Sequence, residues 1–369
     1  MPVPRPAPRP PAAAPRSTAP APPPTLADIA RAAEVSTATV SHALTGTGRI
    51  APGTRRRVRE LAAALGYAGP RPGRAATRTL GLAVTTHAGA DWDYASVAYF
   101  GRVLTAAASA AHARGYALTV LPAARGADPL WHDLAVDGML LLDTPAHDPV
   151  LAALRARGLP LVFDGRPPQP RPGDVWVDND HRETAHRVLD HLAAGGAVRP
   201  ALHAGFGEEN YSRAVTAAYR EWCAARGARP LVIPFRPEDE EGRAFDAALT
   251  RPVGERPDAV YAVYDPGGRQ LLAAARRHGL RVPGELLLVC ASEDEEYARD
   301  GGPDRPAVST VSFGPERIAR EAVAALIALV ERGPGPAPRA LLLPATLHPR
   351  ASSTPVPPPR PRHRPGHRG

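Results

Sequence analysis

The sequence predicts a small all-α domain of three helices, followed by an α/β domain of two lobes in which parallel sheets are flanked by helices. Within residues 25–67, apolar residues recur at helical spacing between residues that favour turns and helix ends. From Thr79 onward, short apolar runs alternate with helical patterns, which is typical of parallel sheets covered on both faces. The length of 369 residues indicates more than one domain. A region as long as the second one is expected to form two sheets rather than one, because a single hydrophobic core does not grow without limit.

The first segment has the pattern of a helix-turn-helix. Ser36 is placed to cap a second helix, residues 37–44, and Gly66 to end a third. Two helices joined by so tight a turn, the second rich in small polar residues, have the geometry that DNA-binding proteins insert into a groove. The alternative is an amphipathic three-helix bundle with no role on DNA.

The run LADIARAAEVSTATVSHAL, followed by TRRRV and LGY, resembles the DNA-binding headpiece of the LacI/GalR family of transcriptional regulators and covers residues 25–67 without a gap. Three positions depart from the family pattern: Glu34 replaces a usual Gly, Ala51 a usual capping Ser, and His42 the Arg of many members. The resemblance implies double-stranded DNA with a palindromic operator as partner. It also implies a homodimer, because one headpiece reads only a half-site.

The resemblance implies two kinds of DNA contact. Side chains on the exposed face of the second helix reach base edges in the major groove; they are Thr37, Ala38 and His42. Other polar and basic side chains contact phosphates, which position the domain without specifying sequence; they are Ser36, Thr39, Ser41, Thr54, Arg55 and Arg57.

Residues 68–78 occupy the place of the family's hinge helix, but the stretch is about one helical turn shorter. Pro70, Pro72 and neighbouring glycines oppose helix formation. The sequence therefore predicts a shortened, flexible linker. Its candidate minor-groove or phosphate contacts are Arg71, Arg74 and Arg78.

Residues 79–353 resemble the type I periplasmic-binding-protein fold that the family uses for effector binding and dimerisation. The matching stretches include DGMLLL at 137–142, VDND at 177–180 and PDAVYAVYD at 257–265. In this fold two lobes exchange strands. The crossovers are expected near Asp178, Thr310 and Gly335.

Effector contacts are expected in the cleft between the lobes, at the carboxyl ends of the strands. The loop after the first strand offers an aromatic ring that can stack on a sugar and an acid that accepts its hydroxyl donors; its candidates are His87, Asp91, Trp92 and Tyr94. Further candidates follow later strands: Asp143, Asp164, Asp178, Arg213, Asp265, Ser292 and Glu293. Of these, Arg213 lies near the family's effector-binding Arg, and Ser292 with Glu293 stands where the family has a ligand Asp.

The two ends of the chain are expected to be disordered. Residues 1–24 consist mainly of Pro, Ala and Arg, and residues 354–369 form a similar basic tail. The formal net charge of +8 suits a polyanionic partner, although the tails carry part of it. There is no apolar signal-peptide core and no run of membrane-spanning length. We therefore expect a cytoplasmic protein, associated with the nucleoid when bound to DNA, and no membrane partner.

Several other classes are not favoured. Cys223 and Cys290 are too few for a disulfide framework and match no metal spacing. His181, His186 and His191 recur five residues apart, which spreads them around a helix rather than aligning them on a metal. The nucleotide-binding, nucleophile-elbow and zinc-protease motifs are missing from the sequence. No enzymatic activity and no metal or redox cofactor are expected.

The sequence thus predicts a sequence-specific transcriptional repressor. A small molecule bound between the lobes, a sugar or sugar derivative, is expected to modulate its operator affinity. The alternative is a DNA-binding regulator whose cleft no longer binds a small molecule and serves for dimerisation or protein docking. Calorimetry with a sugar library separates the two.

Overall fold

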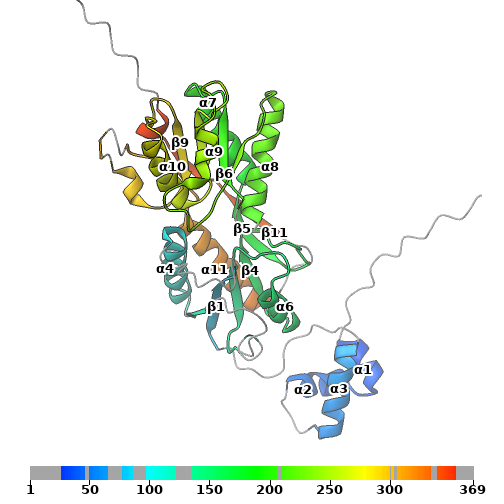
Figure 1. Cartoon of the computed structure of the whole chain (residues 1–369). Helices are drawn as coiled ribbons and strands as arrows, with labels where there is room; N and C mark the ends of the chain where they lie inside the picture. The colour runs from blue at the N-terminus through cyan, green and yellow to red at the C-terminus, as the bar shows by residue number, and fades with distance from the viewer. Residues whose placement is uncertain are drawn as a thin grey trace, which may run out of the picture. The chain divides into compact units, whose positions relative to one another are not determined.

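The computed structural model describes residues 26–45, 50–64, 77–85, 97–121, 131, 134–205, 210–299, 301–302, 306–333 and 339–354. The chain divides into two compact units, Met1–Ala75 and Ala76–Gly369, which are treated separately below (Figure 1). The arm at 1–24, almost all of the basic tail and most of the linker at 68–78 lie outside the described residues.

The first unit contains helices α1 (Leu26–Ala33), α2 (Thr37–Thr45) and α3 (Pro52–Ala64). Ser36 precedes α2, and its hydroxyl oxygen accepts the backbone N–H of Thr39 at 3.0 Å, which is the expected cap. The three helices enclose a small core of side chains: Ile29, Ala30, Ala33, Val40, Ala43, Leu44, Val58 and Ala62.

The turn between α1 and α2 contains Glu34, one of the departures from the family pattern. Glu34 has a φ of 54°, in the left-handed region that glycine adopts readily and other residues rarely adopt. The N–H of Val35 donates to the carbonyl of Ala30 at 3.1 Å and closes the end of α1. This position therefore favours glycine for steric reasons, and the chain places a glutamate there.

The second unit contains two six-stranded sheets, one in each lobe. The first lobe has the strand order β11-β5-β4-β3-β1-β2, with β1 (Thr79–Val84), β2 (Ala117–Leu121), β3 (Gly138–Leu142), β4 (Leu161–Asp164), β5 (Val175–Asn179) and β11 (Arg339–Leu343). All of its pairings are parallel. Helices α4 (Ala98–His112) and α11 (Pro315–Arg332) share one core with this sheet, and α6 (Pro149–Ala156) packs in another.

The second lobe has the order β12-β10-β9-β8-β6-β7, with β6 (Pro200–Ala204), β7 (Val232–Pro234), β8 (Ala259–Ala262), β9 (Leu287–Ala291), β10 (Ser309–Ser312) and β12 (Thr346–His348). Only β12 among these strands pairs antiparallel. Helices α7 (His181–Ala194) and α8 (Asn210–Ala225) pack in one core of this lobe. The other core includes η2 (Arg243–Phe245), α9 (Asp246–Leu249), α10 (Asp265–Arg277) and η3 (Glu295–Ala298), while η4 (Ala351–Ser353) follows β12.

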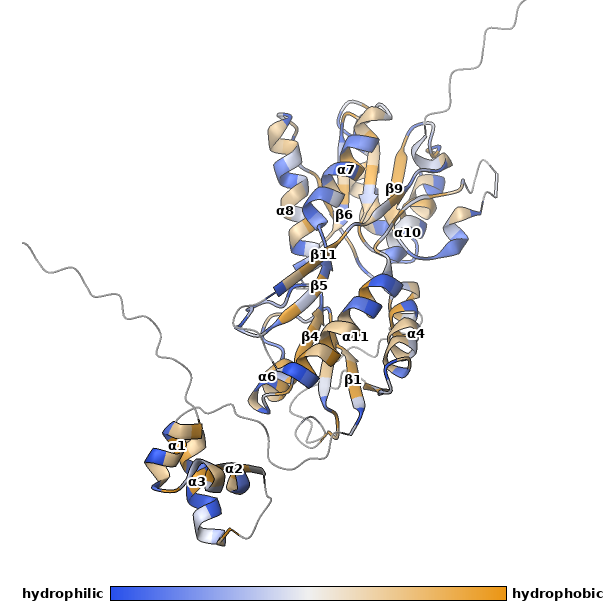
Figure 2. Cartoon of the chain, turned by 180° about the vertical axis from the view of Figure 1, so that it is seen from behind, coloured by the Kyte–Doolittle hydropathy of each residue, from blue (hydrophilic) through white to orange (hydrophobic). Residues whose placement is uncertain are grey.

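The hydropathy of the elements follows this layering. In Figure 2 the strands of the second lobe are largely apolar, whereas α7 and α8 carry alternating polar and apolar surfaces. Strands enclosed by amphipathic helices are the expected arrangement for parallel sheets. The predicted α/β class is therefore confirmed. Among the described helices, none combines the length and the hydropathy needed to cross a membrane.

Between its described elements, the chain passes from one lobe to the other three times. The first passage follows β5 and the second follows β10, close to the predicted positions. The third differs from the expectation of a crossover near Gly335. It lies at residues 344–345, between β11 and β12, because β11 still belongs to the first sheet, where Leu341 pairs with Val177.

Candidate functional site

A cavity of about 130 Å³ lies between the two lobes. Its walls include the carboxyl ends of β3, β4 and β5 from the first lobe and of β8 and β9 from the second. The carboxyl ends of parallel strands are the usual ligand-binding edge of such sheets. The cavity is small beside the roughly 300–1,000 Å³ of drug-sized sites, which favours a small ligand.

Asp164, at the end of β4, is a buried acid of the first lobe's wall, with 6% of its surface exposed. The Tyr99 hydroxyl donates to both of its carboxylate oxygens, at 3.0 and 2.9 Å. Burial raises the pKa of Asp164 to about 7; the tyrosine hydrogen bond opposes this shift and the charge of Asp178 adds to it. Asp164 can therefore exchange a proton near neutral pH.

Asp143 follows β3 and lies beside Asp164. Its φ of 49° is left-handed, a conformation that Asp tolerates better than most residues. Its backbone N–H donates to the carbonyl of Asp164 at 3.2 Å. The turn places a second acid in the same wall of the cavity.

Asp178, at the end of β5, is held by three donors. Nε2 of His181 lies 2.7 Å from its carboxylate, and the backbone N–H groups of Arg166 and Asn179 donate at 3.0 and 2.8 Å. The His181 ring packs against Tyr211 with the ring centres 4.9 Å apart. Asp178 therefore orients a histidine that belongs to the aromatic wall of the second lobe.

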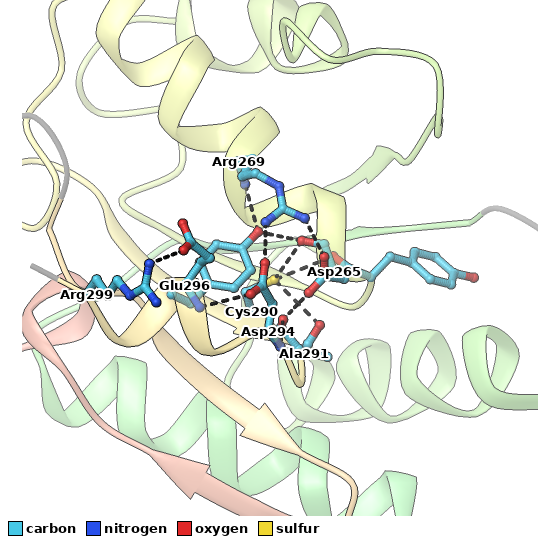
Figure 3. Close-up of polar contacts among 10 residues, drawn as sticks. Asp265, Arg269, Cys290, Ala291, Asp294, Glu296 and Arg299 are labelled. Atoms are coloured by element: carbon cyan, nitrogen blue, oxygen red, sulfur yellow. Dashed lines mark hydrogen bonds and ion pairs between the residues drawn. The ribbon is translucent and has the colours of Figure 1, made fainter. Parts of the chain in front are cut away.

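Asp265 begins α10 and belongs to a polar cluster in the second lobe (Figure 3). The Arg269 guanidinium reaches Asp265 at 2.6 Å and Asp294 at 2.7 Å, and Figure 3 shows it between the two acids. The Ser292 hydroxyl donates to Asp265 and accepts the N–H of Asp294. Burial raises the pKa of Asp265, although Ser292 and Arg269 act in the opposite direction.

Glu293 connects the cavity wall to the second crossover. Its carboxylate accepts the Ser312 hydroxyl at 2.8 Å and the backbone N–H of Phe313 at 2.6 Å. Burial raises its pKa, against the effect of these hydrogen bonds. Both partners lie just before the chain returns to the first lobe.

Most of the predicted effector residues that the structure describes line this cavity: Asp143, Asp164, Asp178, Asp265, Ser292 and Glu293. Arg213 does not. It is exposed on α8, and the helix presents Asn210 and Tyr211 to the cavity instead. The remaining candidates, His87, Asp91, Trp92 and Tyr94, lie outside the described residues.

Sequence reasoning missed the aromatic part of the cavity wall, which includes Tyr99, Phe100, His181, Tyr211, Tyr264 and Phe313. These residues begin helices, precede them or lie in a crossover. One signal was available: several of them follow the end of a strand within a few residues, as the predicted acids do. The spacing of His181 predicts only a place on a helix, whereas the structure places the residue in the cavity wall.

On the first unit, the three predicted base-contacting residues are all exposed on α2: Thr37, Ala38 and His42. Of the predicted phosphate contacts, Ser36 and Arg57 are exposed, while Thr39, Thr54 and Arg55 are partly buried. Nothing is described for the Ser41 side chain, nor for Arg71 and Arg74. The Arg78 guanidinium lies over the Tyr116 ring, 5.2 Å from its centre, on the second unit.

Comparison with known proteins gives two matching families. Residues 25–69 match the bacterial regulatory proteins of the lacI family, and residues 189–353 match the periplasmic binding protein-like domain. The HTH-type transcriptional repressor PurR of Aliivibrio fischeri strain MJ11 is 26% identical over 324 residues, covering 82% of this chain and 90% of PurR. The HTH-type transcriptional regulator CelR of Thermobifida fusca is 28% identical over 317 residues, covering 82% and 91%.

Solved structures agree with these matches. A transcriptional regulator CelR–cellobiose complex superposes with a TM-score of 0.66 at 25% identity, covering 89% of this chain and 99% of that one. The lac repressor dimer bound to operator and the anti-inducer ONPF has the same fold, with a TM-score of 0.62, 21% identity and coverage of 90% and 99%. The chain thus carries the lacI-type headpiece and the periplasmic-binding-protein-like domain of a LacI/GalR family regulator, and it is similar to transcriptional regulators along most of its length.

Proposed function

We propose that this chain is a cytoplasmic repressor that binds a palindromic operator as a homodimer and changes its operator affinity when a sugar or sugar derivative binds between its lobes. The cavity carries this proposal, because its walls come from both lobes. A ligand that fills it contacts both lobes at once and so favours one lobe arrangement over another. The CelR complex, whose ligand is cellobiose, supports the sugar class.

The crossovers offer a route from the cavity to the rest of the molecule. Asn179, at the first crossover, donates from its side-chain amide to the carbonyl of Phe313 at 3.2 Å and of Leu343 at 2.9 Å. Phe313 also lines the cavity. A ligand that moves Phe313 therefore acts on the segments that join the lobes. Couplings between two sites of this kind are typically about 1–3 kcal/mol.

On the DNA side, we propose that Thr37, Ala38 and His42 read bases, since all three side chains are exposed on the helix after the tight turn. We also propose the domain limits stated above, with residues 68–78 as a short linker. Because this linker is shorter than the family's hinge, we expect operator bending close to that of a linker-deleted variant. We propose that the chain binds its ligand without chemistry, as its relatives are transcriptional regulators.

The test is selection of a randomised duplex library by the purified full chain at two salt concentrations. We expect a palindrome that is lost when Thr37→Ala, Ala38→Ser and His42→Ala are combined. The control is Glu60→Gln, an exposed position on α3. Salt-sensitive binding without an enriched sequence overturns specific recognition, because phosphate contacts alone produce that result.

The recovered duplex is then titrated with protein in the presence of a sugar panel, and calorimetry measures ligand binding directly. A sugar that binds and shifts duplex affinity by about fivefold or more supports ligand control. A recovered palindrome with no heat from any sugar favours the alternative, a regulator whose cleft serves for dimerisation or protein docking.

A further inference from the structure

The lining of the cavity is rich in acids and poor in balancing cations. Five of its described residues carry carboxyl groups: Asp143, Asp164, Asp178, Asp265 and Glu293. Among the same lining residues Arg166 is the one arginine. The Arg269 guanidinium forms ion pairs with both Asp265 and Asp294, so it balances the charge of Asp265 only in part. A ligand that enters this cavity meets a negative potential.

These acids differ in how many donors they already have. Asp178 receives three, and Asp265 and Glu293 receive two each. Within the described residues, Asp164 receives one, the Tyr99 hydroxyl, which its two oxygens share. A carboxylate can accept about four hydrogen bonds. Asp164 therefore has unused acceptor capacity in a buried wall, where unpaired polar groups are costly.

Aromatic rings surround the same space. Tyr211 packs edge-on against Tyr264 and Phe313, with ring centres 5.9 and 5.4 Å apart, and Tyr99 packs edge-on against Phe100 at 5.4 Å. All five line the cavity. Ring faces attract cations, and the attraction increases when the cation is removed from water. Carboxylates combined with ring faces are the chemistry that recognises an organic ammonium group.

We propose that the ligand of this cavity carries a positively charged amino group, as an amino sugar does, and that this group binds Asp164. The inference rests on the proposed function, because it assumes that the cavity is the effector site. An ammonium group offers three donors and no acceptor, which matches a wall that supplies acceptors. A neutral hydroxyl has one donor and brings no charge to offset the buried acids.

The raised pKa of Asp164 is consistent with this assignment. Without a cation beside it, burial favours the protonated carboxyl. A bound ammonium group stabilises the carboxylate instead, so Asp164 releases its proton when such a ligand binds near neutral pH. A ligand oxygen that accepts a hydrogen bond from the protonated acid has the opposite effect and keeps the proton in place.

The experiment compares matched sugars on the full-length protein at pH 7 by calorimetry. Glucosamine, galactosamine and mannosamine are each compared with the parent hexose and with the N-acetyl form, which keeps the nitrogen but not the charge. We expect at least one amino sugar to bind tenfold or more tightly than both of its neutral partners. Equal or tighter binding of the neutral partner overturns the inference and leaves the proposed function intact.

The variant Asp164→Asn tests the residue assignment. It should remove the preference for the amino sugar, so that the amino sugar loses at least tenfold more affinity than the parent hexose does. The matched control is Asp190→Asn, which removes one exposed acid from α7 outside the cavity and should leave the preference unchanged. A preference retained in Asp164→Asn, or lost equally in both variants, contradicts the assignment. If no sugar binds, charged or neutral, the proposed effector site fails together with this inference.

Discussion

Asn179 and Leu343 are 164 positions apart in the sequence, and the side-chain amide of Asn179 donates to the Leu343 carbonyl at 2.9 Å. The same amide nitrogen donates to the Phe313 carbonyl at 3.2 Å. Asn179 is 4% exposed. One buried side chain therefore connects all three segments that cross between the lobes.

Replacing Asn179 should weaken this connection. In Asn179→Ala the buried carbonyl of Leu343 and the partly buried carbonyl of Phe313 lose a donor, and an unsatisfied buried group costs about 1–3 kcal/mol. We expect the free energy of unfolding of the second unit to fall by about 2–4 kcal/mol in urea titrations. Asn179→Asp keeps the size but cannot donate, so it should be at least as harmful. A full-stability Asn179→Asp variant would show that the two hydrogen bonds contribute little.

The turn at Glu34 predicts a gain of stability. A residue other than glycine in the left-handed region costs about 1–2 kcal/mol of backbone strain, which glycine relieves. Glycine also has a larger conformational entropy in the unfolded state, which lowers the stability by about 0.5–1 kcal/mol and offsets part of this gain. Glu34→Gly should therefore stabilise the headpiece by about 0.5–1 kcal/mol. Amide hydrogen exchange in α1 and α2 measures this. The control Glu34→Ala keeps a Cβ atom and should give no comparable gain; equal gains in both variants would implicate the glutamate charge instead of the backbone.

Asp164 predicts a dependence of stability on pH. Its pKa is raised from 3.8 to about 7 in the folded chain, so between these values the folded state binds more protons than the unfolded state. The contribution of Asp164 to stability is therefore greatest below pH 4, falls as the pH rises through 4–7, and levels off above. Relative to Asp164→Asn, the native chain should lose about 1–4 kcal/mol of unfolding free energy over that range. Parallel pH profiles for both proteins would contradict the shift.

An ion pair joins the two lobes at their surface. Arg102 on α4 lies 2.9 Å from Glu295 on η3 and 3.5 Å from Glu316. Both acids are substantially exposed, so Arg102→Ala should cost at most about 1 kcal/mol of stability. Because the contact with Glu295 forms between lobes, its loss should lower ligand affinity a few-fold at low salt and less at high salt.

The control for this ion pair is Arg182→Ala. Arg182 pairs with Glu221 at 2.6 Å, and both residues lie on helices of the second lobe. The control removes a pair of the same kind without affecting a lobe–lobe contact. Calorimetric affinities at two salt concentrations should separate the variants. An equal effect of both would show that Arg102 acts through general charge rather than through the lobe arrangement.

The parts of the molecule that could be predicted from the sequence depend on local pattern. The alternation of apolar runs and helical patterns repeats within tens of residues, and Asp164 and Asp178 follow directly from the rule that parallel strands end at one edge. The third crossover lies later in the chain than the sequence predicts, because the pairing of Leu341 with Val177 connects residues far apart in sequence. No local signal records such a pairing.

The same distinction explains the differences at the site. Tyr99, Tyr211 and Phe313 reach the cavity because two lobes pack against each other, and a single sequence does not encode that orientation in any short window. Arg213 is predicted from its resemblance to the family's effector-binding Arg, but the rotation of α8 about its axis leaves it exposed. The acids of the cavity wall could be predicted from their residue type and their position at the end of a strand. To predict the other lining residues, the rotation of each helix about its axis would have to be known.

The outward position of Arg213 has a consequence for which metabolites the regulator can sense. Phosphate monoesters carry about two negative charges near pH 7 and depend on guanidinium or ammonium partners for tight binding. The described wall carries five carboxyl groups and one arginine, Arg166, while Arg213 is turned away, so we expect it to disfavour phosphate monoesters. Under the proposed function, the cavity should bind a free sugar in preference to its phosphorylated product. A cell that phosphorylates the sugar would then remove the signal by that first step, so the response should follow the supply of unmodified sugar rather than its downstream flux.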